Sequence, residues 1–139
     1  MTIMPVTLAA AGILGLLYIY LSARVTMARA SSKISIGEGS QGAVALGKEA
    51  EASQLQIACR AHGNFSEYVP MALILMGGIE MAGASHWFMM LLALLLIGAR
   101  VAHPVGMSRP APNPFRAGGA AVTWAVIVLA SLDALRIAL

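Results

Sequence analysis

Charged residues are scarce in this chain. Only 11% of its 139 residues are Asp, Glu, Lys or Arg, whereas 59% are hydrophobic. Soluble globular domains carry about 25% charged residues, so this composition excludes an ordinary soluble domain and indicates a chain whose preferred solvent is lipid. We interpret residues 1–139 as one small integral membrane domain, with no internal repeat and no attached soluble domain.

Cysteine is almost absent as well, because Cys59 is the only one. A single cysteine excludes an intramolecular disulfide framework and provides no pair of metal ligands, so no metal site is expected. Cys59 stands next to Arg60, whose charge favours a thiolate. No paired base accompanies it, and we interpret the thiol as a small apolar filler.

Long hydrophobic runs are the main feature that is present. A spanning helix needs about 20 mostly apolar residues, and four such stretches predict an all-α integral membrane bundle of four transmembrane helices. Their expected bounds are about 5–26, 55–82, 85–105 and 115–138. No Lys or Arg precedes the first run, which is also too long for the core of a secretory signal, so we interpret it as a helix of the mature protein.

The basic residues predict the topology. With four spans, the first and third connections lie on one face of the membrane, and eight of the nine Lys and Arg residues lie in or beside them. The positive-inside rule therefore places these connections in the cytoplasm and both termini outside. The net charge of +3 is thereby explained without a nucleic-acid partner. The eight residues are Arg24, Arg29, Lys33, Lys48, Arg60, Arg100, Arg109 and Arg116.

A polar stripe enters the second span. Arg60, Asn64 and Glu67 fall on one face of a helix with 3.6 residues per turn, and Glu67 lies ~10 Å along the axis from Arg60. His62 points to the other side of that helix. Ionisable groups at membrane depth are costly, so they are a functional hypothesis by default.

The third and fourth spans bring more polar residues to the same depth. Arg100 and His103 share a helix face, and Arg116 opens the fourth span. A salt-bridge network between Glu67 and Arg60 or Arg100 would only join the helices. However, three arginines and one histidine accompany this single carboxylate, and that excess favours a site for carboxylates or phosphates, which the guanidinium fork binds well.

These residues resemble a known family. The string from Arg60 to Pro70, Arg-x-His-x-Asn-x-x-Glu-x-x-Pro, followed by Arg100-Val-Ala-His103, resembles the MAPEG superfamily of membrane proteins in eicosanoid and glutathione metabolism. The resemblance implies a homotrimer in a bacterial inner membrane, with glutathione bound as co-substrate at each subunit interface near the cytoplasmic face. It also implies that Arg116 holds the thiolate. The residues that would line the glutathione pocket are Arg60, His62, Asn64, Glu67, Tyr68, Arg100 and His103.

The resemblance and the chemistry of a thiol predict the function together. A free thiol with a pKa of about 8.5 is mostly protonated at neutral pH, and a nearby guanidinium favours its charged form. We therefore expect a glutathione transferase or glutathione-dependent peroxidase acting on lipophilic electrophiles or lipid hydroperoxides. Met107 and Ala117 stand where several eicosanoid-pathway members carry hydroxyl side chains, which disfavours a specialised prostaglandin or leukotriene synthase.

Two alternatives of a different class stay open. The cavity could belong to a non-catalytic scaffold that holds a fatty acid or another amphiphile, or the polar residues could serve only to hold a trimer together. Small residues at 9–12 and 117–121 would let helices approach closely, which drives association in lipid. We expect Gly119 to support the assembly in this way.

Overall fold

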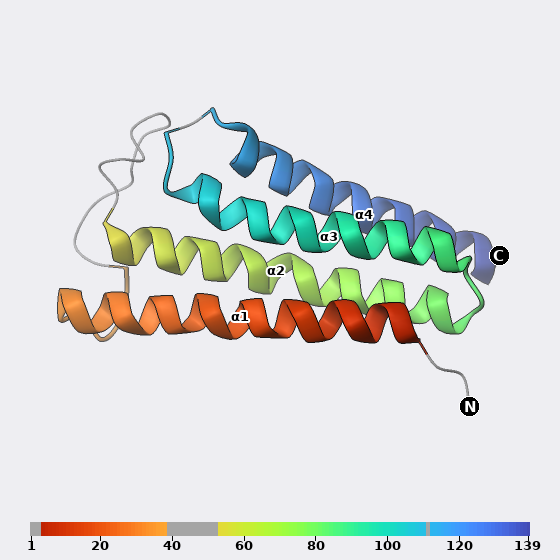
Figure 1. Cartoon of the computed structure of the whole chain (residues 1–139), viewed down its shortest axis with the longest axis horizontal. Coiled ribbons are helices and arrows are strands. Elements are labelled where there is room, and N and C mark those ends of the chain that lie inside the picture. The colour runs from red at the N-terminus through yellow and green to blue at the C-terminus, as the bar shows by residue number, and fades with distance from the viewer. Residues whose placement is uncertain (1–3, 39–52, 111) are drawn as a thin grey trace.

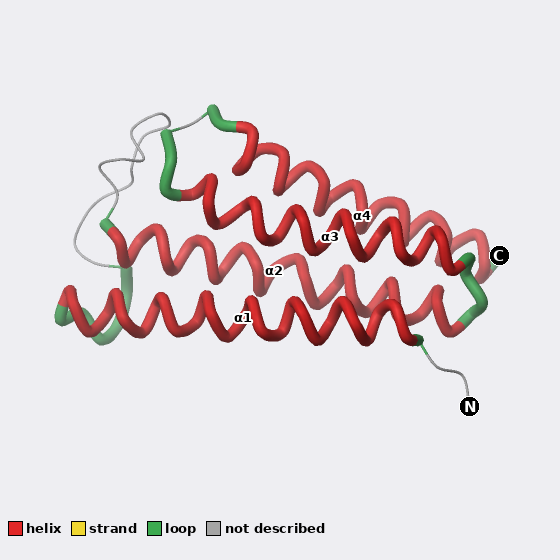
Figure 2. The backbone as a smooth tube through the Cα atoms, in the orientation of Figure 1, coloured by secondary structure: helices red, strands yellow, loops and turns green. Residues whose placement is uncertain are grey.

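Four long helices lie side by side along one direction (Figure 1). In the computed structural model, which describes residues 4–38, 53–110 and 112–139, they are α1 (Pro5–Ser32), α2 (Gln54–Met81), α3 (His86–Met107) and α4 (Pro114–Ala138). The tube in Figure 2 has only helices and loops over the described residues. The predicted all-α bundle of four helices is confirmed.

α1 is longer than the sequence pattern predicts. The apolar run suggested an end near residue 26, but the helix continues to Ser32. Hydropathy marks where lipid-compatible residues stop, whereas a helix ends where its backbone turns. The turn is made by Lys33, which adopts a left-handed conformation (φ 57°) and donates its backbone N–H to the carbonyl of Arg29. The other helix bounds lie within two residues of the expected ones.

Three of the described helices, α1, α3 and α4, are long and apolar enough to cross a membrane. α2 is as long as α1, but its first half carries Arg60, Asn64 and Glu67, so its crossing stays a prediction. Many large apolar side chains on the outside of the bundle are exposed, such as Leu16, Ile74 and Leu94. An apolar exterior of this kind suits lipid rather than water.

α2 and α3 lie at the centre of the packing, because each contacts the other three helices. The most extensive helix pair is α3 with α4, followed by α1 with α2. A continuous apolar core fills the space between the helices along most of their length. It includes Leu14, Leu21, Phe65, Val69, Met76, Met89, Leu92, Leu96 and Val126.

Two glycines allow α3 and α4 to approach closely. A Cβ on Gly119 would stand 2.9 Å from the backbone oxygen of Ala99 and 2.9 Å from Cβ of His103, and one on Gly106 would collide with the backbone of Arg116. Gly119 is buried within the protomer. The close approach that it permits joins two helices of one chain, and its role in the assembly stays a prediction.

The opposite end of the bundle is closed by a contact that the sequence did not reveal. α1 has no side-chain cap and no acidic residue in its first turn. Instead, the Glu80 carboxylate at the end of α2 accepts hydrogen bonds from the backbone N–H groups of Val6 (3.0 Å) and Thr7 (2.8 Å). Because a helix N-terminus has unpaired N–H groups and a positive partial charge, this carboxylate ties α1 to α2.

Candidate functional site

Most of the predicted site residues lie toward one end of the bundle, whereas Glu67 and Tyr68 lie at the middle of α2. The C-terminal ends of α1 and α3 and the N-terminal ends of α2 and α4 meet at this end of the bundle (Figure 1). Of the basic residues assigned to the cytoplasmic face, Lys48 lies outside the described residues; the others lie in or next to these four helix ends. The charge asymmetry used to predict the topology is therefore an asymmetry of the folded molecule.

Asn113 sets where α4 begins. Its side-chain oxygen accepts a hydrogen bond from the backbone N–H of Arg116 (2.9 Å) as the helix N-cap, and Pro114 follows at the first helical position. Its side-chain nitrogen donates to the carbonyls of Gly106 and Pro110, both at 3.1 Å. One amide thus fixes the start of α4 against the end of α3, and so positions Arg116.

Arg100 joins three helices from within the protein. Only 1% of this residue is exposed. Its Nη1 donates to Oδ1 of Asn64 on α2 (2.8 Å), and its Nη2 donates to the backbone oxygen of Gly119 on α4 (2.9 Å). Both acceptors are neutral, and the buried Nε has no hydrogen-bond partner among the described residues. The positive charge is hydrogen-bonded but is not neutralised by a carboxylate in this part of the chain.

His103 lies one turn further along α3 and is 4% exposed. Its Nδ1 is 3.1 Å from the backbone oxygen of Arg116. A carbonyl oxygen can only accept, so Nδ1 carries the hydrogen, and in the neutral ring Nε2 then has the lone pair. Nε2 is buried and has no hydrogen-bond partner among the described residues. The predicted proximity of Arg100, His103 and the start of α4 is therefore present in the fold.

The remaining predicted residues are placed on the outside of this cluster. Arg60 and Glu67 are exposed, and within the described chain neither is joined to a partner by an ion pair. The ring of His62 lies against Tyr18 of α1, with centroids 4.9 Å apart, and Tyr68 lies 6.5 Å from Trp124 of α4. The fold thus brings together Asn64, Arg100 and His103 with the backbone of Arg116, while Arg60 and Glu67 point away from the protomer core.

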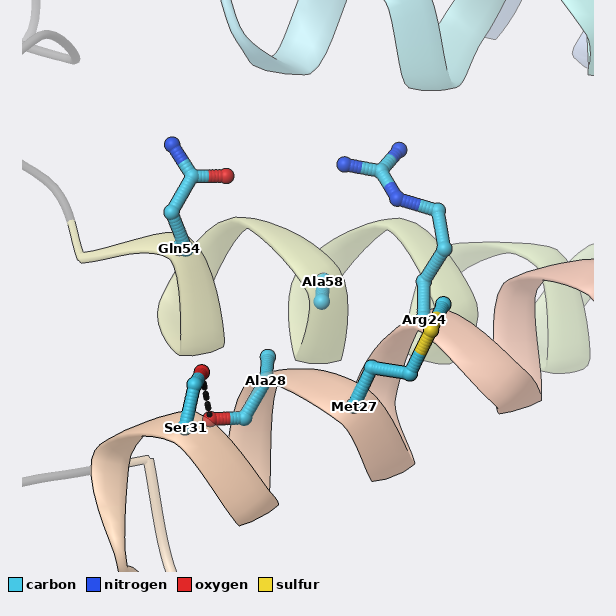
Figure 3. A pocket seen from close by; sticks show the side chains of 6 residues that line it. All are labelled: Arg24, Met27, Ala28, Ser31, Gln54 and Ala58. Carbon is cyan, nitrogen blue, oxygen red and sulfur yellow. Dashed lines mark hydrogen bonds between the residues drawn. The ribbon is translucent and has the colours of Figure 1, made fainter.

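A partly polar cleft at the same end is lined by Arg24, to which the sequence assigns only a role in topology. The cleft has a volume of about 340 Å³ and lies between the end of α1 and the start of α2. Arg24 and Gln54 project their polar groups to the same side of this helix pair (Figure 3). Arg24 was not predicted as a site residue, because it lies in the basic stretch after an apolar span. The positive-inside rule already explains a basic residue at that position.

The thiol of Cys59 has a different neighbour from the one expected. Arg29 of α1, and not the adjacent Arg60, approaches it, with Nη2 3.8 Å from Sγ. The other guanidinium nitrogen of Arg29, Nη1, donates to the carbonyls of Ser35 (3.2 Å) and Gly37 (2.8 Å). No cluster of three or more metal-ligating side chains occurs among the described residues.

A second cleft, of about 430 Å³, runs between α1 and α2 nearer the middle of the bundle. Its walls are almost entirely apolar. They are formed by Ala11, Leu14, Gly15, Tyr18, Phe65, Ser66, Val69, Pro70 and Leu73. The bundle therefore combines a cationic end with an apolar cleft that begins close to it, since Tyr18 lines the cleft and contacts His62.

Comparison with known proteins identifies the family. The MAPEG family model matches residues 7–136. The inner membrane protein YecN of Escherichia coli, in strains K12 and O6:H1, is 36% identical over 77 residues, which cover 55% of this chain and 58% of YecN. No solved structure matches. The fold, the cluster of polar residues and the extent of the family match lead to one conclusion: the chain is an integral membrane protein that belongs to the MAPEG family.

Proposed function

We propose that the protein is a membrane-bound glutathione transferase or glutathione-dependent peroxidase, which forms a glutathione thiolate and uses it against lipophilic electrophiles or lipid hydroperoxides. Membership of the MAPEG family supports a role in glutathione or eicosanoid chemistry. We further propose that it acts as a homotrimer in a bacterial inner membrane, as the name of its relative YecN suggests for the location.

The observation that carries this proposal is the buried charge of Arg100. Among the described residues, the Arg100 guanidinium is held by the neutral oxygens of Asn64 and Gly119, which leave its positive charge in a region of low dielectric. A buried charge without a counter-ion is costly unless an anion compensates it. The exposed Arg60 adds further positive charge at the same end of α2. The site therefore favours an anionic ligand.

Glutathione matches the chemistry of the groups present. It is a peptide with two carboxylates, one ammonium and one thiol. Arginines bind carboxylates through paired N–H groups, and an exposed carboxylate such as Glu67 can accept hydrogen bonds from the ammonium. The partly polar cleft beside Arg24 has room for part of a small anionic peptide.

Arg116 is the residue that we expect to stabilise the thiolate. Its position at the first turn of α4 is fixed by the N-cap of Asn113, so its charge and the positive end of the helix act together on an anion placed there. Lowering a thiol pKa by two units requires about 2.7 kcal/mol of differential stabilisation. Thiolate stabilisation and proximity to a lipophilic partner then supply most of the rate enhancement.

A second candidate function is a non-catalytic scaffold that holds a lipid or another amphiphile. The observation in its favour is the apolar cleft between α1 and α2, which would take an acyl chain while the cationic end binds a carboxylate. In this case Arg116 would bind an anion without any change in the protonation of a thiol.

Glutathione binding to the purified full-length protein separates the two functions. We expect the thiolate absorbance of glutathione to increase on binding at neutral pH. In the Arg116→Ala variant we expect this signal to be at least about tenfold smaller, since a change of one unit in the thiol pKa is a tenfold change in the ionisation equilibrium. The control is Arg136→Ala at the other end of the bundle, which should behave like the wild type. Binding without a thiolate signal would favour the scaffold, whereas an unchanged signal in Arg116→Ala would overturn the role of Arg116 in stabilising the thiolate.

A further inference from the structure

The hydrogen bonding of His103 suggests a role beyond packing. The hydrogen bond between Nδ1 and the backbone oxygen of Arg116 fixes the tautomer and the ring direction. Nε2 is then left as a hydrogen-bond acceptor, buried and without a partner among the described residues, in a residue that is 4% exposed. Buried polar atoms without partners are rare and costly, so this acceptor favours a bound group that can donate a hydrogen bond to it.

The neighbours of His103 restrict what that group can be. The nearest charged groups are the guanidinium of Arg100 on α3 and the side chain of Arg116 on α4. From α2, the amide of Asn64 reaches Arg100. In its neutral form, a ring whose Nδ1 carries the hydrogen presents a lone pair at Nε2. A group that fits Nε2 is therefore a hydrogen-bond donor, and the nearby cations Arg100 and Arg116 favour a donor that becomes an anion when it gives up its proton.

We propose that His103 is the group that takes the proton of the glutathione thiol. This inference rests on the proposed function and adds the destination of the proton. The thiol S–H bond breaks, its electron pair stays on sulfur, and the proton moves to Nε2, directly or through one water. The products are a thiolate beside Arg116 and an imidazolium whose Nδ1–H remains bonded to the Arg116 carbonyl. The positive ring is compensated by the new negative sulfur, as in other thiol–histidine pairs.

The same proton has a defined path in the following step. When the sulfur forms a bond to an electrophilic carbon, the leaving atom or the adduct gains an electron pair. Nε2–H of His103 can return its proton to that atom, which restores the neutral ring. No other reactant is required, because the electron pair comes from sulfur and the proton comes from the original thiol.

The test is a proton balance on glutathione binding to the wild-type protein. Thiolate absorbance gives the thiolate formed per site, and calorimetry in two buffers of different ionisation enthalpy gives the protons released to solvent. The measurement is made at mildly alkaline pH, where a free imidazole with a pKa of about 6.5 is neutral. S-methylglutathione, which has no thiol proton, corrects for the amine and carboxylates. We expect thiolate to form with almost no proton released.

The outcomes separate this inference from the proposed function. One proton released per thiolate would overturn the role of His103 and leave the thiolate chemistry standing. No thiolate at all would overturn the proposed function, and the inference with it. In His103→Gln, whose amide can still donate to the Arg116 carbonyl, we expect less thiolate and one proton released for each. A wild-type ratio in this variant would also overturn the role. His86→Gln, at the opposite end, is the control and should keep the wild-type ratio.

A second measurement decides the question even if His103→Gln does not fold. The chain has only three histidines, so a sample labelled with ¹⁵N in the imidazole rings gives few signals, which the His62→Gln and His86→Gln spectra assign. We expect glutathione to convert the His103 signals of the wild-type protein to those of an imidazolium, and S-methylglutathione to leave them unchanged. A neutral His103 ring in the presence of bound thiolate would overturn the proposal.

Discussion

At the scale of single residues, the pair formed by Asn64 and Arg100 shows how a site residue can also stabilise the fold. We expect Asn64→Leu to destabilise the protein by about 2–3 kcal/mol, because it leaves a charged donor of Arg100 buried without its acceptor. The double variant Asn64→Leu/Arg100→Met should be less destabilised than Asn64→Leu alone, since it removes the buried charge as well. Unfolding in detergent, followed by the helical circular dichroism signal, measures both. Additive losses would show that the two side chains are not coupled.

At the scale of helices, neighbouring glycines at the start of α4 make a matched comparison. We expect Gly119→Ala to lower the free energy of unfolding by about 1–3 kcal/mol, because its Cβ would press on the backbone oxygen of Ala99 and force α3 and α4 apart. Gly118→Ala has no atom within 4 Å of the new Cβ, and we expect it to be neutral or to stabilise the helix by up to about 1 kcal/mol. Equal effects in thermal unfolding would contradict the close packing.

The start of α1 depends on a different helix, which gives another prediction at this scale. We expect Glu80→Gln to destabilise the protein by about 1 kcal/mol and to accelerate hydrogen exchange at the amides of Val6 and Thr7, because the charge at the N-terminus of α1 is removed. Asp133→Asn is the control. It breaks the ion pair on α4 with Arg136, and the Arg136 side chain is 71% exposed. The free energy of unfolding should therefore change by no more than about 0.5 kcal/mol. Unchanged exchange at Val6 and Thr7 would contradict the role of Glu80.

At the scale of the whole molecule, the basic end of the bundle predicts the orientation in the membrane. In a Cys59→Ser background, an impermeant maleimide added to intact spheroplasts should label Leu139→Cys at the C-terminus and should not label Ser108→Cys in the α3–α4 connection. Permeabilised cells, in which both positions should react, provide the control. The reverse pattern would place the cationic end and its site outside the cell.

Much of this protein could be predicted from patterns in the sequence. Four apolar runs predicted four helices because hydropathy and helix length are local properties, whereas α1 continues past the predicted span to the backbone turn at Lys33. The helical spacing of Arg60, Asn64 and Glu67 predicted a shared stripe, but not that Asn64 faces Arg100 while Arg60 and Glu67 are exposed. The family resemblance was confirmed by the match over residues 7–136; the roles assigned to individual residues remain predictions.

The sequence by itself determined that the chain belongs in lipid, that it forms four helices and that most of its basic residues gather at one end, because composition, periodicity and charge act along the chain. Only the tertiary structure decided which polar atoms meet. Arg100 and His103 of α3 both bond to backbone oxygens of α4, and the Glu80 carboxylate of α2 bonds to the start of α1. Each of these contacts joins two helices. Such contacts depend on how closely and at what rotation the helices pack, and that is set by glycines and caps whose effect appears only in three dimensions.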